Sequence, residues 1–167
     1  MLPHIDAAFN LARWLTRNDH DAQDVVQDAM LRAYRHFEGL RGEARPWLLA
    51  IVRNACFSWI RSNRPAEVAA GLDAEAAEAA SAPADGPEAL LARELDRRML
   101  NKAIAALPLQ FREVLILREL EDLSYREIAR IADVPIGAVM SRLARARRLL
   151  AESVRVITLA SRLQTET

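Results

Sequence analysis

Four arginines and no acidic residue occupy the stretch Val134–Leu150, in the C-terminal part of the chain. Residues three or four positions apart share one face of a helix. One such face carries Ala138, Ser141, Arg145 and Arg148, flanked by Arg142. Arginine can bond to guanine edges or to phosphates, so this pattern indicates a helix that reads the major groove of DNA. The alternative is the solvated basic face of an ordinary helical bundle.

A second, shorter helix is predicted directly before this one. Ser124 and Glu127 form an S-x-x-E pattern, which predicts a capping box at a helix start. The residues 132–135 then interrupt the helix, and Pro135 suits the first turn of the next one. The apolar residues expected to face the core from that next helix are Ile136, Val139, Leu143 and Leu150. Two short helices joined at a sharp break are typical of a helix-turn-helix.

The rest of the chain predicts an all-α fold of two small helical domains joined by a flexible acidic linker. Amphipathic helices are expected over residues 3–17, 22–37 and 45–61, with Asp21 as the cap of the second. Residues 65–90 carry six acidic side chains and no basic one, although the whole chain is neutral. An alanine-rich acidic segment without aromatics buries too little surface to order itself. The predicted parts are a domain at 1–64, a linker at 65–89, a domain at 90–152 and a tail at 153–167.

The composition excludes several classes of protein. A single cysteine, Cys56, rules out an internal disulfide and a cysteine-based zinc site made by this chain alone. The three histidines lack ligand spacing, and no nucleotide-binding loop or nucleophile constellation is present, so we expect no metal, no cofactor and no enzymatic activity. No apolar run is long enough to span a membrane, and no signal peptide is recognisable, which predicts a cytoplasmic protein.

Both predicted domains resemble bacterial RNA polymerase sigma factors of the extracytoplasmic-function (ECF) group. The segments DAQDVVQDAMLRAYRHF (21–37) and RPWLLAIVRNACFSWIRS (45–62) are similar to sigma region 2. The segment from Ala106 to Leu150 is similar to sigma region 4. The resemblance implies a protein that binds core RNA polymerase and directs promoter-specific initiation. We expect the free protein to be a flexibly joined pair of domains whose separation the polymerase fixes.

The resemblance also implies protein partners. In the family, a D-x-x-Q-D/E face of the second helix docks on the clamp helices of the beta-prime subunit, and region 4 meets the beta flap. The motif here is Asp24, Gln27 and Asp28. An anti-sigma factor, often bound to the membrane, is a further implied partner and would hold the protein at the inner membrane face.

The resemblance implies that region 2 captures melted −10 DNA. The corresponding residues here are Arg41 and Gly42 in the loop, then Trp47, Arg53, Asn54 and Arg61 in the third helix. Trp47, Asn54 and Arg61 share one stripe of this helix. They combine a ring, an amide and a cation, as single-stranded DNA requires. A core position for Trp47 stays open. Tyr34, Phe37 and Trp59 are expected in the core rather than against DNA.

Region 4 of the family reads the −35 element through the second helix of its helix-turn-helix. The implied contacts here are Arg118, Tyr125, Arg126, Ser141, Arg142, Arg145 and Arg148. Met140 and Ala144 depart from the frequent family pattern, which has a cation and a larger side chain there. Fewer phosphate contacts would weaken binding and its salt dependence.

Two other functions stay open. A stand-alone helix-turn-helix regulator would account for residues 90–150 but not for Asp24–Asp28 or for the stripe that begins at Trp47. A polymerase-binding adaptor that has lost DNA reading would be compatible with Met140 and Ala144.

Overall fold

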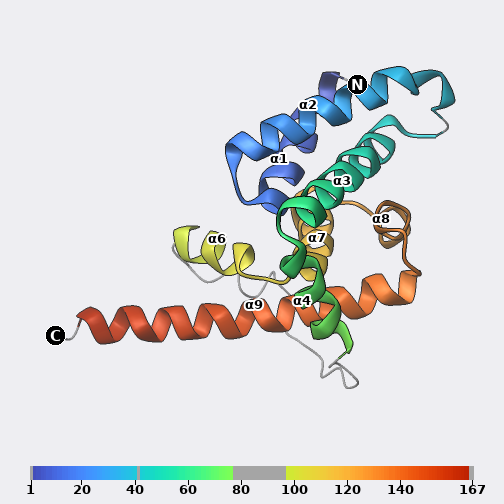
Figure 1. Cartoon of the computed structure of the whole chain (residues 1–167). Coiled ribbons are helices and arrows are strands. Elements are labelled where there is room, and N and C mark those ends of the chain that lie inside the picture. Colours follow the sequence, from blue (N-terminus) through green and yellow to red (C-terminus); the bar gives the residue numbers. More distant parts are fainter. Residues whose placement is uncertain (1, 41, 77–96, 166–167) are drawn as a thin grey trace.

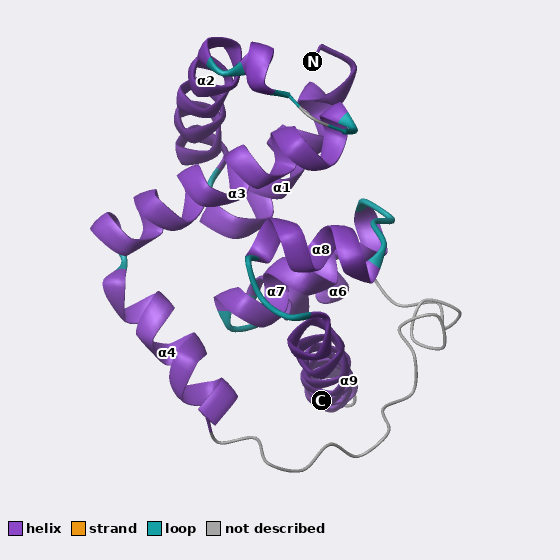
Figure 2. Cartoon of the chain, turned by 90° about the vertical axis from the view of Figure 1, so that its right-hand side faces the viewer, coloured by secondary structure: helices purple, strands orange, loops and turns teal. Residues whose placement is uncertain are grey.

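The computed structural model describes residues 2–40, 42–76 and 97–165 (Figure 1). Every regular element within these residues is a helix, which confirms the predicted all-α class. We call helices α1–α3 the N-terminal bundle and helices α6–α9 the C-terminal bundle. The two bundles lie directly against each other (Figure 2).

Three helices of the N-terminal bundle pack mutually around a small apolar core. Leu11, Val25 and Leu48 are buried representatives of α1, α2 and α3 in that core. The second helix starts earlier than predicted because its cap is Asn18 rather than Asp21. The Asn18 side chain accepts a hydrogen bond from the backbone N–H of Asp21 at 3.0 Å. The elements are η1 (Leu2–His4), α1 (Ile5–Thr16), α2 (Asp19–Arg35), η2 (Phe37–Gly39) and α3 (Ala44–Asn63).

Helix α4 (Pro65–Ala76) corrects the predicted start of the flexible linker. Proline suits a first helical position because its missing N–H needs no partner there. Glu67 then forms ion pairs with both bundles, at 3.1 Å to Arg17 and at 2.9 Å to Arg112. These tertiary contacts order a segment whose composition alone favours disorder. The remainder of the predicted linker, residues 77–89, lies outside the described residues.

The C-terminal bundle ends in one long helix that extends well beyond the rest (Figure 1). Helix α7 packs on α9, and α8 packs against both α9 and α3. Because α9 continues to Thr165, the predicted tail is the continuation of this helix. The elements are α6 (Arg97–Ala105), α7 (Leu109–Leu115), the π-helical turn η3 (Ile116–Leu120), α8 (Tyr125–Ala132) and α9 (Ile136–Thr165).

Three residues expected in the core are exposed. Tyr34 is 77% exposed on the outer side of α2, and Phe37 is 48% exposed because it lies beyond the end of that helix, in η2. Ile136 is 41% exposed because it stands at the first position of α9, beside the turn from α8. Trp59 is half-buried and packs against the core, as predicted.

Arg112 links the two bundles from a fully buried position. Its guanidinium group donates to the backbone oxygen of Leu15 in α1 at 3.0 Å and to the carboxylate of Glu67 in α4 at 2.9 Å. It also donates to the backbone oxygen of Leu107 in its own bundle at 2.7 Å. A buried charge with partners on three segments requires all of them to stay in place. In this structure the contacts of Arg112 therefore hold the two bundles against each other.

The predicted capping box is confirmed at the start of α8. The Ser124 hydroxyl accepts from the backbone N–H of Glu127 at 3.1 Å, and the Glu127 carboxylate accepts from the backbone N–H of Ser124 at 3.4 Å. This pair fixes where the first helix of the helix-turn-helix begins.

Replacing Ser124 with alanine is expected to lower the free energy of unfolding by about 1 kcal/mol, because the backbone N–H of Glu127 loses its partner. The melting temperature should fall by about 2–4 °C, measured by circular dichroism. Ser58→Ala is the matched control, since Ser58 is exposed in the interior of α3. An equal loss in the control would assign the effect to serine removal in general rather than to the cap.

Candidate functional site

An exposed acidic face runs along α2. The side chains of Asp24, Gln27 and Asp28 are all exposed, on the side of the helix away from the core. Asp28 pairs with Arg32 at 2.9 Å, and both side chains are more than half exposed. Such an i,i+4 pair contributes only about 0.3–0.5 kcal/mol, so a cationic partner protein can displace Arg32 at little cost.

Leu31 extends this face and was not identified from the sequence. It follows Asp28 by three positions and Asp24 by seven, which places all three on one side of α2. Its side chain is 54% exposed, and Tyr34 follows one turn later. Exposed apolar and aromatic side chains at the end of a charged face provide the contact area that interface cores use. The helical spacing from Asp24 is the signal by which the sequence could have revealed Leu31.

The three residues of the stripe predicted along α3 differ in their exposure. Asn54 and Arg61 are exposed, while Trp47 is half-buried and packs against the core. The rings of Trp47 and Phe37 pack edge to face, with their centroids 6.5 Å apart. Trp47 therefore supports the core and keeps part of its side chain accessible.

The loop before α3 contains the other residues predicted for −10 contact. Gly42 is exposed with φ of 88°, a left-handed conformation that favours glycine, and a Cβ there would meet no atom within 4 Å. The glycine is thus required by backbone conformation rather than by crowding. Arg41 lies outside the described residues.

Arg53 does not lie with the exposed stripe. Its guanidinium group donates to the Glu113 carboxylate of α7 at 2.5 Å and stacks 3.7 Å from the ring centroid of Phe57. The side chain of Glu113 is fully buried and that of Arg53 is 15% exposed. Asn54 accepts a further bond from Arg53 at 3.2 Å. The predicted DNA contact Arg53 is therefore engaged with the C-terminal bundle.

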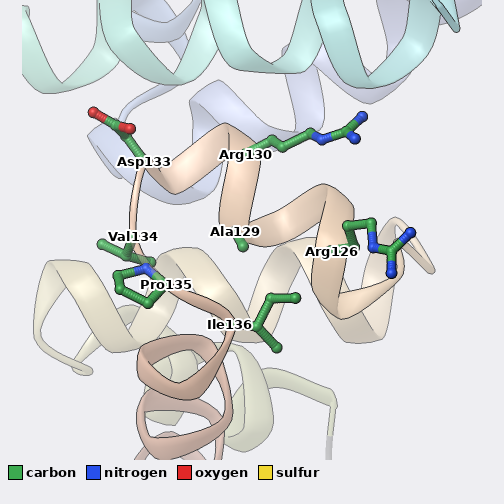
Figure 3. A pocket seen from close by; sticks show the side chains of 7 residues that line it. All are labelled: Arg126, Ala129, Arg130, Asp133, Val134, Pro135 and Ile136. Atoms are coloured by element: carbon green, nitrogen blue, oxygen red, sulfur yellow. The ribbon is translucent and has the colours of Figure 1, made fainter.

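The turn between α8 and α9 has the geometry of a helix-turn-helix. Asp133 ends α8 in the left-handed conformation at φ 56°, and its backbone N–H donates to the Ala129 oxygen. Pro135 then starts α9 by accepting from the backbone N–H groups of Ala138 and Val139. A shallow pocket opens at this turn (Figure 3). Its lining is Arg126, Ala129, Arg130, Asp133, Val134, Pro135 and Ile136.

The first turns of α9 present the residues predicted to read DNA. Ser141 is exposed, and its hydroxyl donates to the backbone oxygen of Gly137 at 3.0 Å. Met140 is 52% exposed beside it, so the departure from the family pattern lies on the accessible surface. Further along the helix, the predicted contacts Arg142, Arg145 and Arg148 are half-buried.

Arg118 and Tyr125 support the helix-turn-helix from the side. The Arg118 guanidinium donates to the backbone oxygen of Leu123 at 2.9 Å and lies 4.7 Å from the Tyr125 ring centroid. These contacts fix the loop that leads into α8. Arg126 is exposed in the first turn of α8, beside the pocket.

Neither a metal cluster nor a membrane span is found in the part of the chain that the structure describes. Within it, no group of three or more histidine, cysteine or carboxylate side chains is placed to hold a metal ion. None of its helices is long and apolar enough to cross a membrane. Cys56 is buried, and this burial, together with the charge of Glu113, raises the pKa of its thiol to about 12. The thiol is therefore uncharged at neutral pH and serves as a core residue.

Comparisons with known proteins agree with this geometry. Residues 2–65 match the family model for sigma-70 region 2, and residues 97–150 match that for sigma-70 region 4. The chain is 36% identical over 152 residues to the ECF RNA polymerase sigma-E factor of Haemophilus influenzae, covering 86% of this chain and 79% of the relative. It is also 36% identical over 141 residues to the ECF RNA polymerase sigma-E factor of Escherichia coli K12. That match covers 80% of this chain and 74% of the relative.

A solved structure shares the overall fold. It contains the sigma factor RpoE in complex with the anti-sigma factor NepR from Bartonella quintana. The TM-score is 0.70 at 28% sequence identity, and the match covers 93% of this chain and 94% of that chain. The likeness therefore includes both helical bundles.

Proposed function

The chain belongs to the ECF group of sigma-70 factors, which direct transcription initiation by RNA polymerase, and we propose that its two bundles hold the two elements of a promoter. Sigma factors are non-catalytic, so the proposal concerns binding alone. One observation carries it: the same chain presents an exposed acidic docking face on α2 and a capped helix-turn-helix at α8 and α9.

Core RNA polymerase is the partner proposed for the α2 face. Asp24, Gln27 and Asp28 would meet the clamp helices of the beta-prime subunit, and the C-terminal bundle would meet the beta flap. The exposure of all three side chains and the weakness of the Asp28–Arg32 pair support this assignment. We propose that the protein performs this function in the cytoplasm, where the polymerase works.

Melted −10 DNA is the ligand proposed for α3 and the loop before it. The accessible part of the Trp47 ring can stack on an unpaired base, and the Asn54 amide can bond to a base edge. Arg61 can meet the backbone phosphate. Binding unstacked bases stabilises the melted state through binding energy, without hydrolysis of a nucleotide. Arg41, Gly42 and Arg53 complete this proposed site.

Duplex −35 DNA is the ligand proposed for the helix-turn-helix. Ser141, Arg142 and Arg145 would enter the major groove from the first turns of α9, with Arg148 following on the same helix. The guanidinium groups of Arg118 and Arg126 and the hydroxyl of Tyr125 would contact the backbone. The exposed Met140 brings an apolar contact where the family commonly has a cation, which favours a base preference with fewer phosphate contacts.

Replacing Arg145 with alanine is expected to weaken binding of the holoenzyme to −35 duplex DNA about tenfold, because one arginine contact to a base or phosphate is lost. Fluorescence anisotropy over a series of salt concentrations measures this affinity. A smaller salt slope would identify a phosphate contact, and relaxed base preference would identify a base contact. Arg155→Ala is the control, since Arg155 is exposed on the same helix beyond the matched region. Equal losses in both variants would contradict specific reading by α9.

An anti-sigma factor is proposed as a second partner. The support is the solved relative with the same fold, which is a sigma factor bound to an anti-sigma factor. Such a partner would compete with core polymerase for the exposed faces of the two bundles and would hold the protein near the membrane if it is itself membrane-bound.

A further inference from the structure

The leading end of α9 is uncharged and apolar. Its first six residues, 136–141, contain no acidic or basic side chain, and the first arginine of the helix is Arg142. Two large apolar side chains are exposed there, Ile136 at 41% and Met140 at 52%. We call these two residues the apolar pair. They are four residues apart and therefore lie one turn apart on the same side of the helix. In a helix-turn-helix, this N-terminal end of the second helix contacts the base edges.

Hydrogen-bonding side chains are scarce at this end of α9. Ser141 is the one polar side chain among residues 136–141, and its hydroxyl already donates to the backbone oxygen of Gly137 at 3.0 Å. Gly137 is exposed, and a Cβ added there would meet no atom within 4 Å. Packing within the described part of the protein therefore does not require glycine at this position. Without a side chain, the backbone next to Met140 can approach a ligand closely.

We propose that Ile136 and Met140 determine the base preference of this chain by contacting the C5-methyl groups of thymines in the major groove. Among the four bases, thymine alone presents a methyl group in this groove. An apolar side chain gains by covering a methyl group, but it cannot bond to the polar edges of the other bases. The inference rests on the proposed function, because it requires α9 to enter the groove of −35 DNA.

Cations that can hold the DNA backbone lie on α8, beside the apolar pair. Arg126 and Arg130 are exposed and four residues apart on this helix. Together with Ile136 they line the pocket at the turn. Both guanidinium groups point away from Asp133, which lies at the other end of the pocket (Figure 3). Phosphate contacts fix the register of a protein on the duplex, and base contacts supply the specificity. Arg126 and Arg130 are therefore placed to hold phosphates while the apolar pair reaches the bases.

The spacing of the apolar pair limits which thymines it can contact. Four residues of an α-helix rise by about 6 Å. Successive base pairs of DNA are about 3.4 Å apart. Two side chains one turn apart therefore reach base pairs that are separated by about two steps or fewer. We expect the −35 element of this chain to contain two thymines within that distance, on either strand.

Replacing thymine with uracil tests the inference, because uracil lacks only the methyl group and keeps the same hydrogen-bonding edge. A preferred −35 duplex is first selected from a randomised duplex pool by the holoenzyme of core polymerase and the unmodified chain. Each thymine of that duplex is then replaced in turn, and the affinity is measured by fluorescence anisotropy. We expect two sensitive positions, each with about fourfold weaker binding, which corresponds to the loss of one buried methyl group.

Alanine variants connect each methyl group with one side chain. Ile136→Ala should abolish the uracil effect at one sensitive position, and Met140→Ala should abolish it at the other. Both side chains are exposed, so circular dichroism should show unchanged folding. Val156→Ala and Leu159→Ala are the matched controls, since both residues are exposed and apolar and lie on α9 beyond the matched region. Each control should keep both uracil effects.

Equal binding of thymine and uracil duplexes by the unmodified chain would overturn the inference. Alanine variants that weaken binding to both kinds of duplex equally would also overturn it, because they would assign a structural role to the apolar pair. Weaker binding to core polymerase with both uracil effects retained would instead place the apolar pair against a protein and would overturn it too. Failure of the proposed function gives a different result, since the holoenzyme would then enrich no duplex sequence, and the inference would fall with it.

Discussion

The double variant Asp24→Arg with Gln27→Ala should bind core RNA polymerase about 100-fold more weakly than the unmodified chain. Both side chains are exposed on the outer face of α2 and contribute nothing to the core, so the fold should be unaffected. The substitution reverses one charge at the centre of the proposed docking face and removes a hydrogen-bonding amide next to it. A like charge at an interface lowers the affinity several-fold to many-fold, and so does an unpaired polar group.

Asp19→Arg provides the control for this experiment. Asp19 is exposed at the start of the same helix and pairs with Arg13 at 2.9 Å, away from the proposed docking face. The same reversal of charge should change the affinity for polymerase by less than about threefold. Affinity is measured by titrating core polymerase with fluorescently labelled protein. Normal binding of the double variant would show that the α2 face is not the docking site.

Replacing Arg112 with methionine should lower the free energy of unfolding by about 3 kcal/mol. Three backbone oxygens would lose a donor, those of Leu15, Ala105 and Leu107. Breaking a buried charge pair costs about 3–5 kcal/mol. The lower end applies because Glu67 keeps its ion pair with Arg17. The expected fall in melting temperature is about 9 °C.

Arg147→Met is the matched control for Arg112→Met. Arg147 pairs with Glu119 inside the C-terminal bundle, and both side chains are about a quarter exposed. A partly exposed pair is worth about 0–1 kcal/mol, so the melting temperature should fall by no more than about 3 °C. Calorimetry on both variants measures the difference. Equal losses would mean that the bonds from Arg112 to the N-terminal bundle add nothing to stability.

Much of the local structure follows from the sequence. Helical periodicity predicts the three N-terminal helices, and the S-x-x-E pattern predicts the start of α8 because the cap uses residues three positions apart. The exposure of Asp24, Gln27 and Asp28 follows in the same way, since these residues alternate with buried ones on α2. Local patterns are sufficient wherever the partners are neighbours in sequence.

Contacts between distant segments could not be predicted in this way. The pair Arg53–Glu113 joins residues 60 positions apart, and Asn10–Glu121 joins residues 111 positions apart. The sequence does contain one signal, because the charged residues Arg112 and Glu113 lie within a short helix whose other residues, apart from Gln110, are apolar. Such charges are buried only when a partner is supplied. For the same reason, composition wrongly predicted disorder for the segment that forms α4. Glu67 of this helix pairs with arginines that lie outside the segment, and these ion pairs stabilise the helix.

Tyr34 and Phe37 show the limit of assigning aromatics to the core. Phe37 follows the buried Ala33 by four residues, which is helical spacing, but α2 ends at Arg35, before Phe37. Their surroundings in the structure account for their exposure, since Tyr34 extends the α2 face and Phe37 contacts Trp47.

The most direct test of the central claim is transcription by core RNA polymerase supplemented with this protein on a library of promoter sequences. Promoter-specific transcripts are predicted with the unmodified chain and with Asp19→Arg, and loss of transcripts is predicted with Asp24→Arg and Gln27→Ala. Absence of transcripts with the unmodified chain, together with retained binding to duplex DNA, would contradict the account. That result would favour a stand-alone helix-turn-helix regulator, whereas polymerase binding without any DNA preference would favour an adaptor.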